Sequence, residues 1–233
     1  MRLGAASDFP PNLRRSLQFF LSSAKSKRIQ PAPDGITSNS ALLAENLIVT
    51  SPTQSNPNPA RLLLPIQPDD HAIGATDAPY TLVEYGDYEC PDCGSLFLAI
   101  RDLQATFGNA LRLVFRHYPL LGIHHRAQQA AEAAEAAGAQ GRFWEMHSLL
   151  FENQGLLDTK SLYKHAAKLS LDGERFRREL SQRIYEPRVR EDFRRGVVNG
   201  VYGTPGLFIN GVRHNGALDT NSLLAQLEAK MKA

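Results

Sequence analysis

The chain changes at residue 61 from a polar, proline-rich stretch to alternating apolar segments. Residues 79–88, PYTLVEYGDY, are a mostly apolar run with β-branched and aromatic side chains, which is typical of a buried strand. Residues 91–108 repeat apolar side chains at helical spacing and end at a glycine, as helices often do. A second apolar run follows at 111–120. We therefore predict a strand, helix, strand unit with a right-handed crossover between parallel strands.

A long helical section is predicted between residues 125 and 200. Residues 125–139 are dense in alanine, the strongest helix former, and residues 142–154 place aromatic and aliphatic side chains at helical spacing. Asp158 and Asp172 are suitable caps for two further helices. We interpret the methionine and aromatic residues of this section as core.

The last part of the chain returns to strand signals. Pro187 opens a further helix, because a proline is well tolerated in the first turn. Residues 206–211 and 212–218 then predict two short strands, joined at the Asn-Gly pair of 210–211 that favours a hairpin. A final helix is predicted over 220–232.

Residues 1–60 contain runs of Pro, Ser, Asn and Thr that bury too little apolar surface to fold, so we predict a disordered leader or linker. Residues 13–28 place apolar side chains on one helical face among basic residues; we favour a short helix without function over contact with a membrane surface. The apolar run at 17–21 is too short for a secretory signal or a membrane span. As written, the sequence predicts a cytoplasmic protein without a visible membrane tether, or a periplasmic or extracytoplasmic one if the start or a tether is missing.

Composition narrows the expected partners. A chain of 233 residues with 42% hydrophobic residues can bury one good core. The net charge is +2, so nothing global favours nucleic acid as a partner. The basic excess belongs to residues 1–65, which hold seven Lys/Arg and three Asp/Glu, leaving 19 and 21 for the rest.

The only two cysteines, Cys90 and Cys93, stand in the stretch ECPDCG. Cysteines this close cannot close a long loop, so a structural disulfide between them would restrict the unfolded chain very little. A zinc site is usually completed by a second CxxC or HxxxH pair, and the sequence has none. The seven histidines are scattered, and we interpret each as a surface or hydrogen-bonded residue. We therefore favour a redox pair and expect neither a metal nor a cofactor.

The predicted position of the pair explains how it would react. At the start of a helix, first-turn amides and the positive helix end lower a cysteine pKa from about 8.5 toward about 3.5–7.5. Cys90 is thereby the expected nucleophile, and Cys93, one helical turn along, the expected resolving thiol. Negative charge from Asp92, with Asp87 and Glu89, opposes the thiolate and should move the pair toward the reducing side.

Glu84 is a carboxylate in an otherwise apolar predicted strand, six residues before Cys90. It is either a solvated edge residue or a partly buried relay for the proton of Cys93. We favour the relay because burial of a carboxylate requires a reason, and we expect Arg116 or His117 to pair with it.

Thr204 and Pro205 precede the predicted strand GLFIN, where a proline cannot donate to a sheet ladder. A cis bond between them would resolve this and would present the backbone of Thr204 to an extended substrate. An ordinary trans proline entering an edge strand is the alternative, and the sequence leaves both open.

Three stretches, VEYGDYECPDCG, AAEAAGAQGRFWEMHSLLFENQ and RVREDFRRGVVNGVYGTPGLFING, together resemble the DsbA-like branch of the thioredoxin superfamily. They are similar in particular to the thioredoxin-like domains fused to some bacterial sodium/proton antiporters. The resemblance covers residues 61–233 and implies an α/β thioredoxin fold with a helical subdomain inserted at about 119–200. It also implies dithiol–disulfide exchange, with a cis-Pro205 loop beside the cysteines. The Pro-Asp pair between them departs from the Pro-His of the best-known strong oxidant.

We therefore expect a protein disulfide oxidoreductase that acts as a monomer on protein or peptide thiols, with a separate redox partner. Substrate would dock as an extended strand near Pro91, Asp92, Thr204 and Pro205. The direction of exchange, as oxidase, reductase or isomerase, stays open. Two alternatives are a redox-sensing or metal-holding module without turnover, and a glutathione-linked transferase or isomerase, against which the intact CxxC argues.

Overall fold

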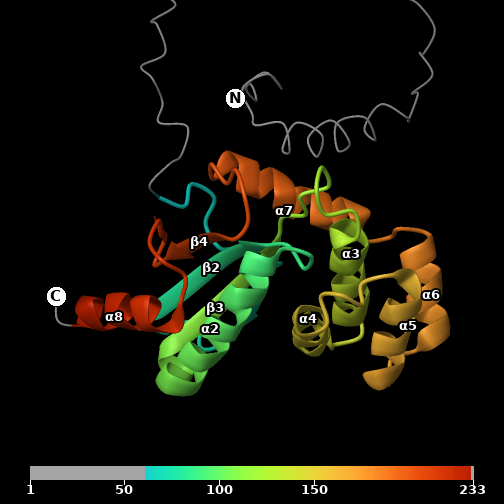
Figure 1. The fold of residues 1–233 in the computed structure, drawn as a ribbon, viewed down its shortest axis with the longest axis horizontal. Helices are drawn as coiled ribbons and strands as arrows, with labels where there is room; N and C mark the ends of the chain where they lie inside the picture. Colours follow the sequence, from blue (N-terminus) through green and yellow to red (C-terminus); the bar gives the residue numbers. More distant parts are fainter. Residues whose placement is uncertain (1–60, 232–233) are drawn as a thin grey trace, which may run out of the picture.

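A computed structural model describes residues 61–231 of the chain (Figure 1). The predictions made for residues 1–60 lie outside the described residues.

Five strands form one mixed sheet in the spatial order β1-β3-β2-β4-β5. They are β1 (His71–Ile73), β2 (Tyr80–Gly86), β3 (Leu111–His117), β4 (Gly206–Ile209) and β5 (Val212–Arg213). Strands β2 and β3 are parallel, as predicted, and the other neighbours are antiparallel. The helix α2 (Pro91–Phe107) connects β2 to β3 and is followed by a short 3-10 turn, η2 (Gly108–Ala110).

The edge strand β1 was not predicted from the sequence. Its three residues, His-Ala-Ile, alternate too briefly to give a strand signal. It pairs antiparallel with β3, so that His71 lies opposite Phe115.

Helices cover both faces of the sheet (Figure 1). On one face, α2 and α8 (Thr220–Met231) contribute Leu96, Ile100 and Leu223 to a core that includes Leu82 of β2. On the other face, α7 (Glu186–Val198) packs Phe193 against the sheet.

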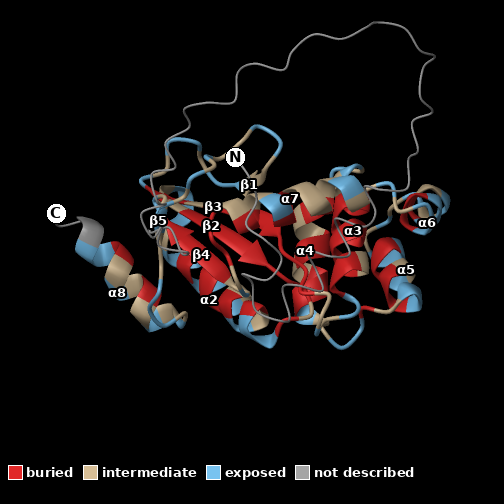
Figure 2. Cartoon of the chain, turned by 90° about the horizontal axis from the view of Figure 1, so that it is seen from above, coloured by how far each residue is buried: buried red, intermediate tan, exposed pale blue. Residues whose placement is uncertain are grey.

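Between β3 and β4 the chain forms a group of helices beside the sheet: α3 (Ala127–Gly138), α4 (Phe143–Glu152), α5 (Thr159–Lys168) and α6 (Gly173–Ser181), followed by α7. The alanine-rich α3 is buried along almost its whole length, as Figure 2 shows, because its small side chains admit close neighbours on several sides. Asp158 and Asp172 cap α5 and α6 as predicted.

The fold class predicted from the sequence is therefore confirmed: an α/β thioredoxin fold with an inserted group of helices. Within residues 61–231, no helix combines the length and the apolar character that crossing a membrane requires.

Candidate active site

The two cysteines lie where the sheet, α2 and the inserted helices meet. Cys90 is the N-cap residue of α2, with extended backbone, and Pro91 occupies the first turn as expected. Both cysteines are free thiols, and both are buried within the core cluster that also contains residues of α3 and α4. The pair is thus enclosed by the inserted helices rather than displayed on an isolated turn.

The surroundings of Cys90 favour its thiolate. A hydrogen bond from the Cys93 thiol is the largest influence, joined by Thr204 and by the backbone amides of Cys93 and Asp92; together they outweigh burial and lower the pKa of Cys90 to about 6. The Cys90 sulfur lies 3.4 Å from the carbonyl oxygen of Thr204. The Thr204 hydroxyl is buried with no hydrogen-bond partner among the described residues.

Cys93 has the opposite character. Its side chain is fully buried, and this burial, together with the hydrogen bond to Cys90 and the nearby Glu84 carboxyl, raises the pKa of Cys93 well above its usual value. The amide of Asp87 donates to the Cys93 sulfur over 3.5 Å. The site therefore holds one reactive thiolate and one protonated thiol that needs a base before it can react.

Glu84 lies buried in β2, 1% exposed, as the relay interpretation requires. Its Oε1 atom has no hydrogen-bond partner within residues 61–231. Burial, reinforced by the charge of Cys90, raises the pKa of Glu84 to about 8. A carboxyl with this pKa exchanges its proton close to neutral pH.

The expected pairing of Glu84 with Arg116 or His117 is wrong. Glu84 lies opposite Phe115 in the β2–β3 register, so the next residue, Arg116, points to the other face of the sheet. There its guanidinium contacts the Asp70 carboxylate at 2.6 Å and the Tyr85 hydroxyl at 2.6 Å. His117 is on the face of Glu84, but its ring turns to Glu135 in α3, with 3.0 Å between Nε2 and Oε1.

The three acidic residues near the cysteines do not act as expected. Asp92 is exposed to solvent, and its carboxylate is not among the main influences on the pKa of Cys90. The buried carboxylate of Asp87 accepts hydrogen bonds from the amides of Glu89 and Leu120, both at 2.8 Å. Glu89 in turn accepts from the amide of Arg126. Asp87 and Glu89 thus hold loops in place. From the sequence we had expected their charges to oppose the thiolate.

Two residues of this site were missed from the sequence. His124 places Nδ1 2.8 Å from Asp87 Oδ2, and this hydrogen bond, followed by the charges of Asp87 and Cys90, raises the pKa of His124. Gln154 donates from Nε2 to the carbonyl oxygens of Tyr88 and Cys90, at 3.0 and 2.8 Å. Both come from loops distant in sequence, so no local spacing could have revealed them.

The Thr204-Pro205 bond is cis, which decides between the two alternatives that the sequence left open. It lies at the start of β4, with Gly206 opposite Tyr85 of β2. The structure thus brings Thr204 and Cys90 together from residues 114 positions apart.

Two hollows flank the first turns of α2 next to the cysteines. One, of about 490 Å³, is lined by Asp92, Ser95, the segment 216–219 before α8 and the first residue of that helix. The other, of about 430 Å³, is lined by Pro91, Phe151 and Gln154 among others. Leu98, which is 49% exposed, borders both. An exposed apolar side chain thus borders both depressions.

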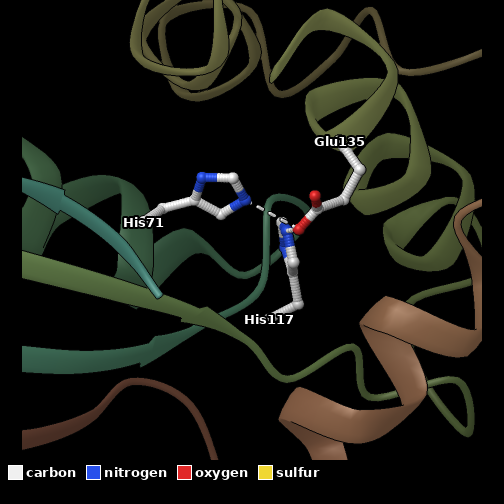
Figure 3. Close-up of side chains that lie close together, drawn as sticks. All are labelled: His71, His117 and Glu135. Carbon is white, nitrogen blue, oxygen red and sulfur yellow. Dashed lines mark hydrogen bonds and ion pairs between the residues drawn. The ribbon is translucent and has the colours of Figure 1, made fainter. Parts of the chain in front are cut away.

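Residues with metal-ligand chemistry gather at a second place. Among the described residues, one group has three such side chains within mutual reach: His71, His117 and Glu135 (Figure 3). The sequence had suggested separate, unremarkable histidines.

Comparison with known proteins identifies a family for this chain. Residues 67–229 match the family model described as Thioredoxin. The Na(+)/H(+) antiporter NhaA 1 of Salinispora arenicola is 48% identical over 165 residues, 70% of this chain and 25% of that protein. A protein of the same description from Mycolicibacterium vanbaalenii is 43% identical over 181 residues, 75% of this chain and 29% of that protein. The chain thus spans about a quarter of the length of these curated relatives.

Solved structures agree on the fold. BdbD from Bacillus subtilis, in oxidised form, superposes with a TM-score of 0.60 at 23% identity, covering 70% of this chain and 94% of that one. A thioredoxin-like oxidoreductase from Silicibacter pomeroyi gives 0.61 at 24% identity, covering 72% and 95%. The alpha-DsbA1 protein of Wolbachia pipientis gives 0.61 at 20% identity, covering 72% and 93%. The family model matches most of the chain, including the cysteine pair. The chain therefore belongs to the thioredoxin family.

Proposed function

We propose that the protein is a thiol–disulfide oxidoreductase that acts on protein or peptide thiols through Cys90 and Cys93. The observation that carries this proposal is the contrast within the pair: the pKa of Cys90 is lowered to about 6, whereas that of Cys93 is raised well above its usual value. Cys90 is mainly a thiolate at neutral pH, and Cys93 stays protonated until a base removes its proton. This division suits a nucleophile and a resolving thiol.

The reaction proceeds through two exchanges. The Cys90 thiolate attacks one sulfur of a substrate disulfide, so that a Cys90–substrate disulfide forms and the other substrate sulfur leaves as a thiolate. Cys93 then loses its proton and attacks the Cys90 sulfur, which releases the second substrate thiolate. The pair has become a disulfide, and two electrons have passed to the substrate. The reverse sequence oxidises a substrate dithiol.

Glu84 is the base proposed for the second exchange. Its ionised fraction rises around its pKa of about 8, and its carboxyl is near enough to Cys93 to raise the pKa of that thiol. Transfer of the Cys93 proton to Glu84 generates the attacking thiolate and leaves the buried carboxyl neutral, which avoids burying two negative charges.

The substrate is proposed to dock as an extended segment between the cis-Pro205 loop and the start of α2. Thr204 supplies a backbone carbonyl at the Cys90 sulfur, and Pro91 and Asp92 border the hollows on either side of α2. Leu98 offers apolar contact to substrate side chains there. These features suit an unfolded or loosely folded polypeptide better than a small rigid ligand.

The pKa of Cys90 also bears on direction. A thiolate stabilised to this extent lies between thioredoxin, with a cysteine pKa of about 7, and DsbA, with about 3.5. We therefore propose a reduction potential between their values of about −270 and −120 mV.

Antiport is no part of this proposal, because the similarity to the antiporters covers only 25–29% of their length. The two alternative functions considered from the sequence predict different behaviour in an assay. A redox sensor or metal-holding module would not turn over, and a glutathione-linked enzyme would require glutathione as its substrate.

Trapping of substrate tests the proposal. The Cys93→Ser variant should accumulate mixed disulfides when mixed with an oxidised model protein, because the second exchange is blocked. The matched Cys90→Ser variant should trap none, since its remaining thiol is buried and protonated. Wild-type protein should catalyse disulfide formation in a reduced, unfolded substrate in a glutathione buffer. Equal trapping by both variants, or no turnover by the wild type, would contradict the proposal.

A further inference from the structure

Three side chains from three separate elements converge at the junction of the sheet and the inserted helices. His71 comes from the edge strand β1, His117 from the end of β3, and Glu135 from α3, and Figure 3 shows their polar ends meeting. The Nε2 atoms of the two histidines lie 2.9 and 3.0 Å from the same carboxylate oxygen, Glu135 Oε1. All three ligand atoms lie within 4.8 Å of one another.

This set matches the donors that a zinc-like ion takes. Two imidazole nitrogens and one carboxylate oxygen are a known ligand set for Zn²⁺, with the fourth position open to water. Ligand atoms lie about 2.0–2.2 Å from such an ion, which places neighbours of a tetrahedral set roughly 3.3 Å apart. The two nitrogen–oxygen separations are already near this value. Binding therefore requires mainly that the two imidazole nitrogens approach each other.

The surroundings hold the ligands in place and leave a way in. The ring of His71 stacks on Phe143 with a centroid distance of 3.4 Å, which fixes its orientation. The side chain of His71 is 20% exposed, while those of His117 and Glu135 are 1% and 8% exposed. An ion can thus reach the buried ligands past His71.

Two features limit the affinity. The Nε atom of Arg188 lies 3.9 Å from Glu135 Oε1, so a metal ion would share this carboxylate with a guanidinium. Metal binding through Nε2 also moves the proton of a neutral imidazole to Nδ1, and His117 Nδ1 is buried without a partner in residues 61–231. We therefore expect weaker binding than at a structural zinc site.

We propose that His71, His117 and Glu135 form a binding site for one divalent transition-metal ion of the zinc type. The ion would cross-link β1, β3 and α3, and so tie the sheet to the inserted helices. This site is separate from the cysteine pair and does not depend on the proposed exchange reaction.

The test uses the full chain with Cys90 and Cys93 oxidised to a disulfide, which removes thiolate binding. Zn²⁺ binding is measured by competition with a chromogenic chelator, and Co²⁺ binding by its visible absorption. His71→Gln is the first variant, because its partly exposed side chain can change with little effect on the core. Glu135→Gln is the second. His125→Gln, which removes an exposed histidine elsewhere, is the matched control.

We expect one Zn²⁺ per chain in the wild type and in the His125 variant, and at least about tenfold weaker binding in the other two. Co²⁺ should give bands of a nitrogen and oxygen site without the sulfur charge-transfer band. The melting temperature should rise with Zn²⁺ in the wild type but not in His71→Gln. Failure of the wild type to bind, or equal binding by wild type and His71→Gln, would overturn the proposal and leave the cluster an ion-pair network only.

Discussion

Two buried glutamates in this protein have opposite protonation behaviour. Glu84, beside the cysteines, has no hydrogen-bond partner at Oε1, and burial raises its pKa to about 8. Glu135, at the joint between sheet and inserted helices, receives His71 and His117 on one oxygen, and these contacts hold its pKa well below the usual range despite burial. Burial alone therefore does not decide the charge of a carboxyl; the groups around it do.

The difference separates a reactive region from a structural one. An unpaired carboxyl costs stability when it ionises but can move a proton near neutral pH. A carboxylate that accepts hydrogen bonds from several partners keeps its charge and fixes the elements that supply those partners. Three substitutions, in order of expected effect, test whether the two regions differ in this way.

The largest effect is expected from Glu135→Gln, measured by urea unfolding at pH 7 with a chelator present. Removing the charge leaves the buried ring of His117 and the partly exposed ring of His71 without their carboxylate, so we expect a loss of about 3 kcal/mol in the free energy of unfolding. The control is Glu145→Gln, which breaks an exposed pair with Arg142 and should cost less than about 1 kcal/mol. Equal losses in the two variants would mean that the buried network stabilises the fold no more than an exposed ion pair does.

Glu84→Gln should have the opposite sign. The folded pKa of about 8 lies above the unfolded value of about 4.3, so the folded protein loses stability as pH rises between them. The variant does not lose this stability, because glutamine does not ionise. The disulfide form lacks the charge of Cys90, which makes the pKa shift of Glu84 smaller than in the reduced protein. In that form we expect the variant to match the wild type near pH 4 and to be more stable by on the order of 2 kcal/mol at pH 9.

The same variant should change the kinetics of exchange. Resolution of a mixed disulfide by Cys93 should slow and lose its dependence on a group with a pKa near 8, whereas the pKa of Cys90 should stay unchanged. An unaltered pH profile for resolution would show that Glu84 is not the base.

A smaller effect is expected from His124→Gln. His124 is held by Asp87, and its pKa is raised partly by the charge of Cys90, so its positive form favours the thiolate. The variant should raise the pKa of Cys90 by about half a unit. His125→Gln, with an exposed neighbouring side chain, should not shift it, and a shift in both would point to a general effect of the loop.

The elements that could be predicted from the sequence are those set by local patterns. Strand β2, helix α2 and the caps Asp158 and Asp172 depend on local periodicity and turn chemistry, and local patterns are visible in one sequence. Strand β1 was missed because three residues carry no period. The cysteine pair was found because its spacing is itself the signal.

Side-chain partners were harder to predict. The partners proposed for Glu84 were wrong because strand register, which no local pattern fixes, turns Arg116 away and sends His117 to α3. His71 and Glu135 are 64 residues apart, and only the fold brings them together. The opposite behaviour of the two glutamates follows from such distant contacts.

The most direct measurement is the pH dependence of alkylation of the reduced protein, with the modified cysteine identified by mass spectrometry. We expect Cys90 to be modified first, at a rate that follows a pKa of about 6, while Cys93 stays protected across neutral pH. A midpoint near the ordinary cysteine value of about 8.5, or first modification at Cys93, would contradict the assignment of nucleophile and resolving thiol.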